Sequence, residues 1–418
     1  MISVSIITIG DELLIGQVID TNSAWIAQEL NKIGIPVLRR VAVGDNFDQI
    51  WNALNEESQK SKVILITGGL GPTADDITKP LLCKYFDGKM VINNDTLENV
   101  THLFEKIFKR PLTERNIKQA EVPNTCKVLI NPRGTAPGML FEKKDCIFVS
   151  MPGVPHEMKG IMSDHVIPLL QEKFELSYIS HRTLVTFGIG ESMLADLIQS
   201  FEEKLPTHIK LAYLPNYGIV RLRLTSSGKN KDAIEKEIDQ LFHELQVMVK
   251  DYLVTDEDEP MEKVVAKLLS KNNETLSTAE SCTGGYLSHL ITSIPGSSAY
   301  FSGSIVSYSN TIKENLLDVK KEIINSNGAV SEPVVIEMAK GALKKLNTTY
   351  TIAVSGIMGP DGGSTEKPVG TVWVAVGNRD NIITKQFHFR FDRLKNIQLT
   401  AMNAFNLLRI FIMNQTKN

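Results

Sequence analysis

The sequence predicts an α/β protein made of two α/β domains with mainly parallel or mixed sheets, joined through a small α+β middle domain. Three observations support this prediction. The chain has 418 residues, more than one hydrophobic core usually organises. Short β-branched runs alternate with segments of helical spacing near both ends of the chain. A stretch with a different pattern separates the two ends, so the predicted domains are residues 1–170, 171–254 and 255–418.

The first domain is predicted from alternating strands and helices. Its strand candidates are SVSIITIG, VLRRVAVG, KVILITGG and CIFVSMPG. In the first intervening segment, Ile26, Leu30 and Ile33 recur at the spacing of one helix face. This alternation favours right-handed βαβ units and a mainly parallel sheet covered on both faces. Because several strands end in glycine followed by polar residues, we expect a ligand beyond their carboxyl ends.

The middle and last domains are separated by the acidic, proline-containing stretch TDEDEPMEK near residues 255–260. Before it, GIVRLRLTSSG alternates residue type as a half-exposed strand does, and KDAIEKEIDQLFHELQVMV has helical spacing. After it, the strand candidates are ETLSTAES, SGSIVSYS, YTIAVSGIMG and GTVWVAVG. The sequence therefore predicts a small α+β unit followed by a second α/β domain.

Composition argues against several classes of protein. The net charge of −3, without a clustered basic face, gives no case for direct nucleic-acid binding. The four cysteines lie far apart, so neither a disulfide framework nor a zinc site is indicated. The N-terminus reads as a buried strand and not as a signal peptide, and no apolar run approaches the roughly 20 residues of a membrane span. We expect a soluble, cytoplasmic protein without a membrane partner.

A glycine-rich turn in the first domain is a candidate ligand site. TGGLGPTADDITKP (67–80) follows an apolar strand and precedes a helical segment. Glycines allow close backbone approach to a ligand, helix-terminal N–H groups attract phosphate, and Asp75 and Asp76 supply the oxygen ligands that Mg²⁺ prefers. The alternative is a tight turn with an aspartate helix cap. Three further small-residue turns carry polar groups: GDELLIGQVIDTN (10–22), PRGTAPGM (132–139) and MPGVPHEM (151–158).

These four motifs, in this order, resemble the molybdopterin-binding MoaB/Mog-type domain that opens CinA-family proteins. The resemblance implies a pocket for a phosphorylated ligand and an ADP-ribose pyrophosphatase activity that needs a divalent metal, magnesium or similar. By position it implies Asp76 and its neighbour Asp75 as metal ligands. Molybdopterin-handling relatives most often have an Arg-Asp pair where this chain has Asp75-Asp76. This difference argues against a molybdenum-cofactor function. The implied pocket residues are Asp11, Glu12, Asn22, Gly68, Gly69, Gly71, Thr135 and Gly138. His156 is interpreted as a loop or pocket-wall residue and not as a base.

The last domain contains a second candidate site at LSTAESCTGG (276–285), where a predicted strand meets a helix. Because Gly284 and Gly285 open the helix, we expect its unpaired N–H groups to point toward Ser281. A serine is a competent nucleophile only if a base takes its proton. His289 and His388 are interpreted as structural, which disfavours a Ser-His-Asp triad. Lys313 can serve as the base if its pKa is lowered, the alternative being an ordinary solvated lysine.

The motifs of this domain resemble the CinA C-terminal domain, the nicotinamide-nucleotide amidohydrolase or NMN deamidase (PncC-type) module. The matching stretches are TAESCTGG, PGSSAYFSGSIVSYSNTIK, GAVSEPVV, VSGIMGPDGGSTEKPVGTVW and FDR. The resemblance implies hydrolysis of nicotinamide mononucleotide (NMN) to nicotinate mononucleotide and ammonia. It implies Ser281 as nucleophile, Lys313 as general base and Tyr308 as a positioning or proton-relay group. No metal is expected for this amidase.

The resemblance also implies binding residues. Arg393 would contact the phosphate, for which its planar fork is suited. The loop 356–370 would border the pocket, with glycines that allow close approach. Cys282, next to the nucleophile, is interpreted as a small filler residue. The remaining residues assigned to the substrate site, or to the ordering of its turn, are Thr278, Glu280, Thr283, Gly284, Gly285, Gly356, Gly359 and Gly362.

Three functional hypotheses follow. The first is an enzyme of pyridine-nucleotide salvage with an amidase in the last domain and a metal-dependent pyrophosphatase in the first. The second keeps only one active half, the other being a binding or scaffolding domain. The third is a non-catalytic partner protein in competence or DNA damage, which the family name suggests. The family resemblance also implies a homodimer or larger assembly.

Overall fold

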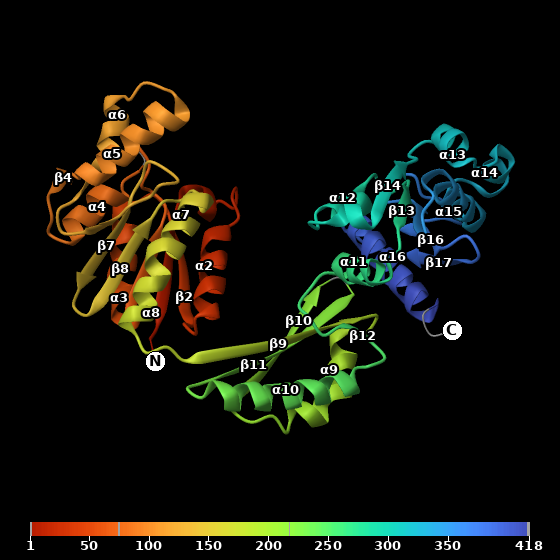
Figure 1. The fold of residues 1–418 in the computed structure, drawn as a ribbon, viewed down its shortest axis with the longest axis horizontal. Coiled ribbons are helices and arrows are strands. Elements are labelled where there is room, and N and C mark those ends of the chain that lie inside the picture. Colours follow the sequence, from red (N-terminus) through yellow and green to blue (C-terminus); the bar gives the residue numbers. More distant parts are fainter. Residues whose placement is uncertain (1, 74–75, 217, 416–418) are drawn as a thin grey trace. The chain divides into compact units, whose positions relative to one another are not determined.

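The computed structural model describes residues 2–73, 76–216 and 218–415 (Figure 1). Contacts divide the chain into two compact units. Unit 1 comprises residues 1–181 and 225–238, and unit 2 comprises residues 182–224 and 239–418. The predicted fold class is confirmed, since each end of the chain folds around its own α/β sheet and a small α+β arrangement connects them in sequence.

Unit 1 contains a six-stranded sheet with the order β2-β1-β3-β8-β7-β6. Val4 and Ile6 of β1 lie in one buried cluster, whereas Ile7 and Ile9 lie in another. This alternation follows from the pleat of a strand, and it means that both faces of the sheet are covered. The parallel strands are β1 (Val4–Ile9), β2 (Val37–Val43), β3 (Val63–Thr67) and β8 (Cys146–Met151), and the antiparallel strands are β6 (Lys127–Leu129) and β7 (Gly138–Lys143).

The helices of unit 1 form a layer on each face of this sheet (Figure 1). Ile26 and Leu30, predicted to share a helix face, are fully buried beside Val4 and Ile6. On this face lie α2 (Thr21–Lys32), α7 (Pro155–Ile161) and α8 (Ile167–Lys173), and on the other lie α3 (Phe47–Lys60) and α4 (Thr78–Tyr85). The short helix α1 (Asp11–Leu14) follows β1.

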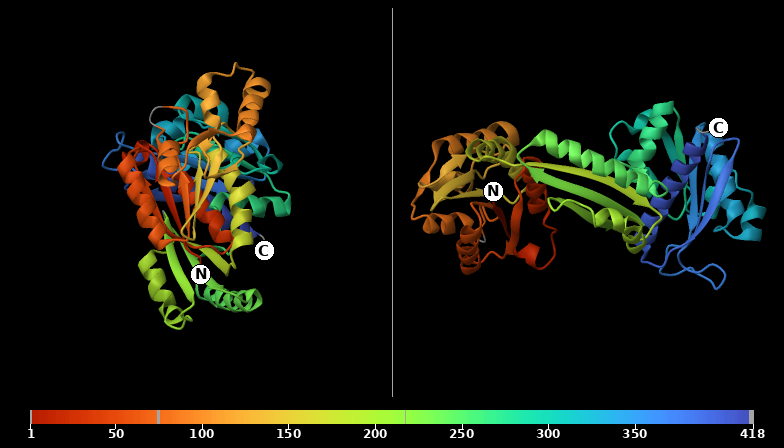
Figure 2. Two further views of the ribbon diagram at one scale, coloured as in Figure 1. Left: turned by 90° about the vertical axis from the view of Figure 1, so that its left-hand side faces the viewer. Right: turned by 90° about the horizontal axis from the view of Figure 1, so that it is seen from below.

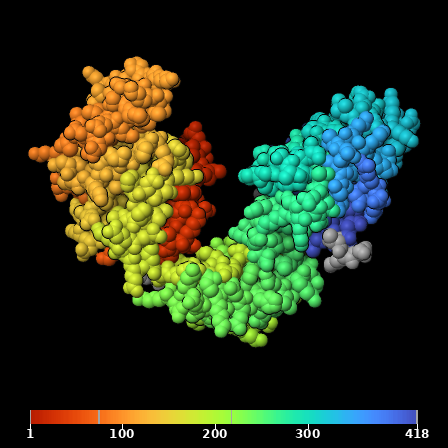
Figure 3. Space-filling model, viewed as in Figure 1, coloured from red at the N-terminus to blue at the C-terminus, as the bar shows by residue number. Residues whose placement is uncertain are grey.

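Residues 86–125 form a lobe at the end of unit 1 that is orange in Figures 1 and 3. The lobe contains an antiparallel pair of short strands in which Val91 pairs with Val122. This pair is not predictable from the sequence, because three residues are too few to show a periodicity. Its elements are β4 (Met90–Ile92), α5 (Asn94–His102), the π-helix η1 (Leu103–Phe108), α6 (Glu114–Ile117), the 3₁₀-helix η2 (Lys118–Ala120) and β5 (Glu121–Pro123).

The middle segment is a four-stranded sheet with the order β10-β11-β9-β12 and two helices on one face (Figures 1 and 2). In β11 the buried residues Val220, Leu222 and Leu224 alternate with partly exposed ones, as the sequence pattern predicted. The elements are β9 (Tyr178–Phe187), α9 (Glu191–Glu202), β10 (Ile209–Asn216), β11 (Ile219–Gly228), α10 (Lys231–Met248) and β12 (Leu253–Thr255).

The last domain, within unit 2, contains a five-stranded sheet with the order β14-β13-β15-β16-β17. The second strand of this order, β13 (Leu276–Glu280), runs parallel to both its neighbours, β14 (Phe301–Val306) and β15 (Tyr350–Gly356). Strands β16 (Thr371–Gly377) and β17 (Ile382–His388) extend it in antiparallel fashion. The helices are α11 (Met261–Asn272), α12 (Tyr286–Thr292), α13 (Asn310–Leu317), α14 (Lys321–Asn327), α15 (Glu332–Leu346) and α16 (Arg393–Gln415).

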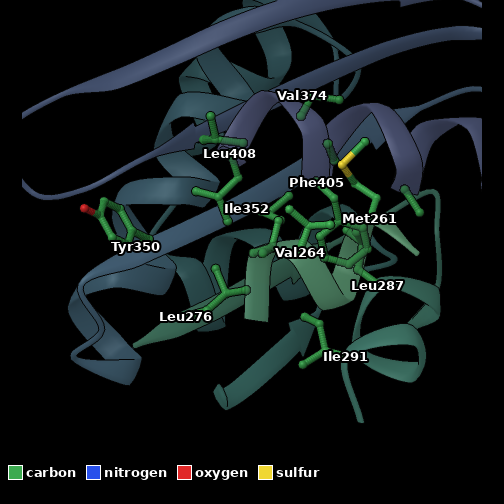
Figure 4. Close-up of a cluster of buried hydrophobic side chains, with 14 of the residues drawn as sticks. Met261, Val264, Leu276, Leu287, Ile291, Tyr350, Ile352, Val374, Phe405 and Leu408 are labelled. Atoms are coloured by element: carbon green, nitrogen blue, oxygen red, sulfur yellow. The ribbon is translucent and has the colours of Figure 1, made fainter. Parts of the chain in front are cut away.

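Two hydrophobic cores cover the faces of this sheet. One lies under α13, α14 and α15. The other lies under α11, α12 and α16, and Figure 4 shows part of it around Val264, Ile352 and Phe405. Val185 and Ile219 of the middle sheet belong to this second core, so these parts of unit 2 share one apolar interior. Among the described residues, no helix has the combination of length and apolar character that crossing a membrane requires.

Candidate functional site

The turn after β13 presents Ser281 at the carboxyl end of this strand, which lies between β14 and β15. The backbone N–H of Ser281 donates to the carbonyl of Val354 over 3.1 Å, which fixes the residue to the end of the neighbouring strand β15. Gly284 and Gly285 have φ values of 60° and 100°, a left-handed conformation that disfavours other residues. The chain therefore turns sharply from β13 into α12, and Ser281 lies at this bend.

The Glu280 carboxylate caps the start of α12. It is fully buried and accepts hydrogen bonds from the backbone N–H groups of Gly285, Leu287 and Ser288 over 2.9–3.0 Å. The hydroxyls of Thr283 and Ser288 donate to it as well. The expectation that the helix N–H groups point toward Ser281 is therefore wrong, because an internal carboxylate already uses them.

Lys313 approaches Ser281 from the first turn of α13, whose N-cap Ser309 accepts from the N–H of Ile312. The Lys313 Nζ donates to the Ser281 Oγ over 2.9 Å and to the Ser307 carbonyl over 2.8 Å. Only 1% of Lys313 is exposed. Burial lowers the pKa of this ammonium, because the charged form loses its hydration.

No carboxylate offsets this effect in the part of the chain that the structure describes, because none forms an ion pair with Lys313. Glu280 directly precedes Ser281, but its carboxylate accepts hydrogen bonds from backbone N–H groups at the start of α12. In its neutral form, an amine bonded to a serine hydroxyl can remove the hydroxyl proton. The pair can thus act as nucleophile and base.

A cavity of about 300 Å³ opens beside the pair. Arg393, on its rim, donates to the Gly359 carbonyl over 2.8 Å and to the Tyr308 hydroxyl over 3.0 Å. Tyr308 is 63% exposed, so its hydroxyl lies at the mouth of the cavity, whereas its backbone carbonyl accepts from Lys313 over 3.4 Å. The hydroxyl of Tyr308 is bonded to Arg393 and not to the reacting pair.

The loop after β15 forms one wall of this cavity. Gly356, Gly359 and Gly362 all line it. Gly359 and Gly362 have φ values of 85° and 91°, and a Cβ on Gly356 would lie 2.7 Å from a methyl carbon of Val372. Glycine is therefore required here for backbone conformation at two positions and for space at the third.

The predicted residues of the last domain divide into two groups. Those that line the cavity are Ser281, Tyr308, Lys313, Gly356, Gly359, Gly362 and Arg393. Those behind the turn are Thr278, Glu280, Thr283, Gly284 and Gly285, and the Thr278 hydroxyl bonds to Ser304 and Glu280. The second group orders the turn and does not reach the cavity.

Some lining residues were not singled out from the sequence. They are Asn310, Ala329, Val330, Ser355, Ile357, Met358 and Asp361. All lie inside the motifs quoted above, but nothing in the pattern distinguishes them from their neighbours. Cys282 also lines the cavity, and burial raises the pKa of its thiol to about 12. A thiol of this pKa is not a thiolate at neutral pH, which agrees with its interpretation as a filler residue.

Unit 1 has a smaller cavity, of about 130 Å³, at the carboxyl ends of β1 and β3. The Asn22 side-chain amide donates to the Gly153 carbonyl over 2.7 Å, whereas its buried Oδ1 has no hydrogen-bond partner among the described residues. Glu12 also lines this cavity. Of the pocket residues expected in the first domain, Glu12 and Asn22 are the two that line it.

The remaining expected residues of this domain lie outside the cavity lining. Asp11 and Asp45 each accept the other's backbone N–H, which ties two loops together. Gly138 packs against Ile161, where a Cβ would come within 3.0 Å of a methyl carbon. The others outside the lining are Gly68, Gly69, Gly71 and Thr135.

The two glycines after β3 still have a clear structural reason. Gly68 has a φ of 115°, and a Cβ there would lie 2.2 Å from the Ile9 carbonyl oxygen. Gly69 has a φ of 64°, and a Cβ there would lie 2.1 Å from the Thr78 hydroxyl. Because a side chain at Gly68 or Gly69 would clash, only glycine at these positions lets the turn pass closely over β1 and the start of α4.

Asp76 organises its own loop. Its carboxylate accepts from the backbone N–H groups of Gly71 and Thr73 over 2.8 Å, and from the Thr73 hydroxyl. Asp75 lies outside the described residues. Within the described ranges, no group of three or more His, Cys, Asp or Glu side chains is placed to hold a metal ion. The described residues therefore show no complete metal site, and no catalytic step is assigned to a metal.

Comparison with known proteins identifies three segments. Residues 5–172 match the family described as "Probable molybdopterin binding domain". Residues 181–255 match the "Damage-inducible protein CinA KH domain", and residues 258–412 match the "CinA C-terminal domain". The family names and their order agree with the resemblance drawn from the motifs at both ends, and the KH assignment of the middle segment is new.

Two relatives match nearly the whole length of this chain, and a solved structure matches part of it. The CinA-like protein of Cytophaga hutchinsonii is 46% identical over 404 residues, which cover 97% of this chain and 96% of the relative. The CinA-like protein of Flavobacterium psychrophilum is 45% identical and covers 97% of each chain. The crystal structure of the competence/damage inducible protein CihA from Agrobacterium tumefaciens is 35% identical over 36% of this chain and 94% of that one, with a TM-score of 0.35. The chain belongs to the CinA family.

Proposed function

We propose that the last domain hydrolyses the carboxamide of NMN to nicotinate mononucleotide and ammonia, with Ser281 as nucleophile and Lys313 as general base. The observation that carries this proposal is the 2.9 Å hydrogen bond between the buried Lys313 Nζ and the Ser281 Oγ. A buried lysine without a carboxylate partner is costly to keep charged, and such groups are characteristic of functional sites.

The reaction requires two transfers of the nicotinoyl group, first to Ser281 and then to water. Lys313 takes the proton from the Ser281 Oγ, which attacks the carboxamide carbon, and the same proton passes to the departing nitrogen to release ammonia. The nicotinoyl group is then held as an ester on Ser281. Lys313 next takes a proton from water, whose oxygen attacks the ester carbon. Nicotinate mononucleotide leaves, and the proton returns to the Ser281 oxygen.

The oxyanion in both steps needs hydrogen-bond donors. The N–H groups of Gly285, Leu287 and Ser288 are bonded to Glu280 and are not candidates. Among the described residues, the backbone N–H of Cys282 interacts with the thiol of its own residue and donates to no other protein acceptor. This N–H lies directly after the nucleophile, and Cys282 lines the cavity, so it is the proposed donor.

The cavity suits a small anionic nucleotide with a cationic ring. Arg393 at the rim is the group for the phosphate, where its guanidinium can bind two oxygens. Asp361 provides a carboxylate on the lining for the positively charged pyridinium. The glycine wall allows the ligand to approach the backbone closely.

The direct test is ammonia release from NMN by the full chain, measured with a chelator present. Ser281→Ala should abolish release, and the chelator should have no effect because the amidase is proposed to need no metal. Unchanged release from Ser281→Ala would contradict the assignment of the nucleophile. The absence of release from the unmodified chain would contradict the proposed activity itself.

For the first domain we propose binding and hydrolysis of a pyrophosphate of the ADP-ribose type, as the family resemblance implies. The unpartnered Asn22 Oδ1 at the cavity supports the binding part, because it is an acceptor that a ligand hydroxyl can satisfy. Asp76 is the described candidate ligand for a divalent metal, and Asp75 is the second candidate. The measurement is ADP-ribose turnover with added Mg²⁺ or Mn²⁺.

The alternative is a non-catalytic protein acting in competence or DNA damage. Its net charge of −3 gives little electrostatic attraction to nucleic acid, which argues against direct binding. A mobility shift of DNA that weakens steeply with added salt, together with no turnover of either nucleotide, would favour this alternative.

A further inference from the structure

A second cavity in unit 2, of about 240 Å³, lies apart from Ser281 and Lys313. It is formed where β11 of the middle sheet meets α11, α12 and α16. Its apolar floor includes Ile219, Met261 and Phe405, which are buried members of one hydrophobic core. Met261 and Phe405 lie next to one another in Figure 4. The floor is therefore held in place by the core itself.

Polar groups without protein partners border this floor. In the part of the chain that the structure describes, the Tyr286 hydroxyl and the Gln398 amide form no hydrogen bond, although both residues are partly buried. Glu262 is also partly buried. Burial raises the pKa of its carboxyl, and only its own backbone N–H and the charge of Arg221 act in the opposite direction. Polar groups that border an apolar floor and are left without protein partners are typical of a ligand site.

The same residues indicate the chemistry of the ligand. A glutamine amide can bond at once to the amine and the ring nitrogen N7 of adenine. The Glu262 carboxylate is a second acceptor for an exocyclic amine, and the Arg221 guanidinium, bonded through Nε to Asp258, retains donors for a ring nitrogen. Tyr286 offers an aromatic ring for stacking. The cavity is smaller than the 300–1,000 Å³ or so of drug-sized sites, which suits a single base.

We propose that this cavity, defined by Arg221, Glu262, Tyr286, Gln398 and Met402, is a binding site for a purine base that carries an exocyclic amine. The base enters the apolar floor with its amine toward Glu262 and Gln398, and an attached ribose faces solvent. The occupant contacts both the middle sheet and the last domain, since Arg221 belongs to β11 and Gln398 to α16. The site does not depend on the proposed amidase activity.

The test is calorimetric titration of the full chain with adenosine and with purine riboside, which lacks only the amine. Adenosine should bind at least tenfold more tightly, and Gln398→Leu or Glu262→Ala should reduce this preference to about twofold or less. Met402→Trp fills the cavity and should abolish binding of both nucleosides. The matched control is Ile410→Trp, an exposed position on the same helix, which should bind as the unmodified chain does.

Three outcomes would overturn the proposal. One is the absence of adenosine binding at adenosine concentrations up to about 1 mM, the weakest dissociation constant that would still support the site. Another is equal binding of adenosine and purine riboside. The third is adenosine binding that survives in Met402→Trp, which would place it elsewhere, for example at the proposed ADP-ribose site of the first domain. Gln398→Leu, a change at a partly exposed helix position, keeps the test usable if the tryptophan variant does not fold.

Discussion

The Nζ of Lys313 donates a hydrogen bond to the Oγ of Ser281 over 2.9 Å, and 32 residues separate the two in sequence. Ser281 lies directly after strand β13, whereas Lys313 lies in the first turn of α13 and is almost fully buried. Two consequences of this pairing can be measured, one in the rate of catalysis and one in its pH dependence.

Lys313→Met should reduce kcat for NMN by about 10²–10⁴-fold, the usual contribution of a general base. Methionine keeps most of the apolar stem, so the fold should be retained. Ammonia release and the circular dichroism spectrum together check this. Lys321→Met, at an exposed position of α14, is the matched control and should behave as the unmodified chain does. A kcat within threefold of the control would remove Lys313 from the mechanism.

The pH profile should report the lowered pKa of Lys313. The active form is the neutral amine, so kcat/KM should rise with pH through the folded-state pKa and level off below 10.5, the ordinary value for lysine. Rates measured from pH 6 to about 10.5 with a constant-ionic-strength buffer would show this limb. A profile that is flat over that pH range would argue that no lysine titrates in catalysis.

The Glu280 cap should be essential for stability. Glu280→Gln keeps the shape of the side chain but replaces one acceptor oxygen by an amide donor. Depending on the orientation of the amide, this donor faces either the N–H groups of Gly285 and Leu287 or the N–H group of Ser288. A buried donor left without an acceptor costs about 1–3 kcal/mol, so the free energy of unfolding should fall by at least about 2 kcal/mol. Urea unfolding measures this free energy, and Glu322→Gln, at an exposed position, is the control. A loss no larger than that of the control would mean that the cap is dispensable.

The fold could be predicted further than the site. Short β-branched runs that alternate with segments of helical spacing predicted both sheets, because strands buried on both faces read as continuous apolar runs. The Ile26 and Leu30 face of α2 was predicted from the helical spacing. The burial of Lys313 was not predictable in this way. Burial depends on how α13 packs against the sheet, whereas the sequence nearby gives only an isolated lysine.

The turn residues show a second limit of the sequence. Glycine motifs predicted close backbone approach at Gly68 and Gly359, but not whether a ligand or the protein itself fills the space. Gly138 packs against Ile161, although the motif resemblance implied a place in the pocket. Likewise, the Glu280 carboxylate bonds to N–H groups five to eight residues later, outside the N-cap spacing that sequence rules describe.

A buried lysine in unit 1 gives an independent test of stability against pH. Lys79 is 7% exposed and donates to the Gln119 carbonyl, and burial lowers its pKa to about 8. Between pH 8 and 10.5 the unfolded chain holds a proton at Lys79 that the folded chain has lost, so stability should rise with pH there. Relative to Lys79→Met, the unmodified chain should gain up to about 1.4 kcal/mol per pH unit. A pH-independent difference would contradict the lowered pKa.

Asp76→Asn tests the first domain. If Asp76 holds a divalent metal as the resemblance implies, turnover of ADP-ribose should fall at least about 100-fold, because a neutral amide is a poorer ligand than a carboxylate. Since Asp76 also holds its own loop, Mn²⁺ affinity should be measured directly by paramagnetic resonance. Asp87→Asn, in the turn after α4, is the control. Full turnover and unchanged Mn²⁺ affinity in Asp76→Asn would exclude this metal ligand.

Arg393 separates phosphate binding from catalysis at the proposed amidase site. Arg393→Lys keeps the positive charge but loses the planar fork that binds two oxygens, so KM for NMN should rise about tenfold while kcat changes little. Nicotinamide riboside lacks the phosphate, and the substitution should leave its kcat/KM nearly unchanged. Because Arg393 also donates to Tyr308 and Gly359, a general disturbance of the cavity would lower kcat/KM for both substrates. Equal losses for the two would therefore show that Arg393 shapes the cavity and does not bind the phosphate.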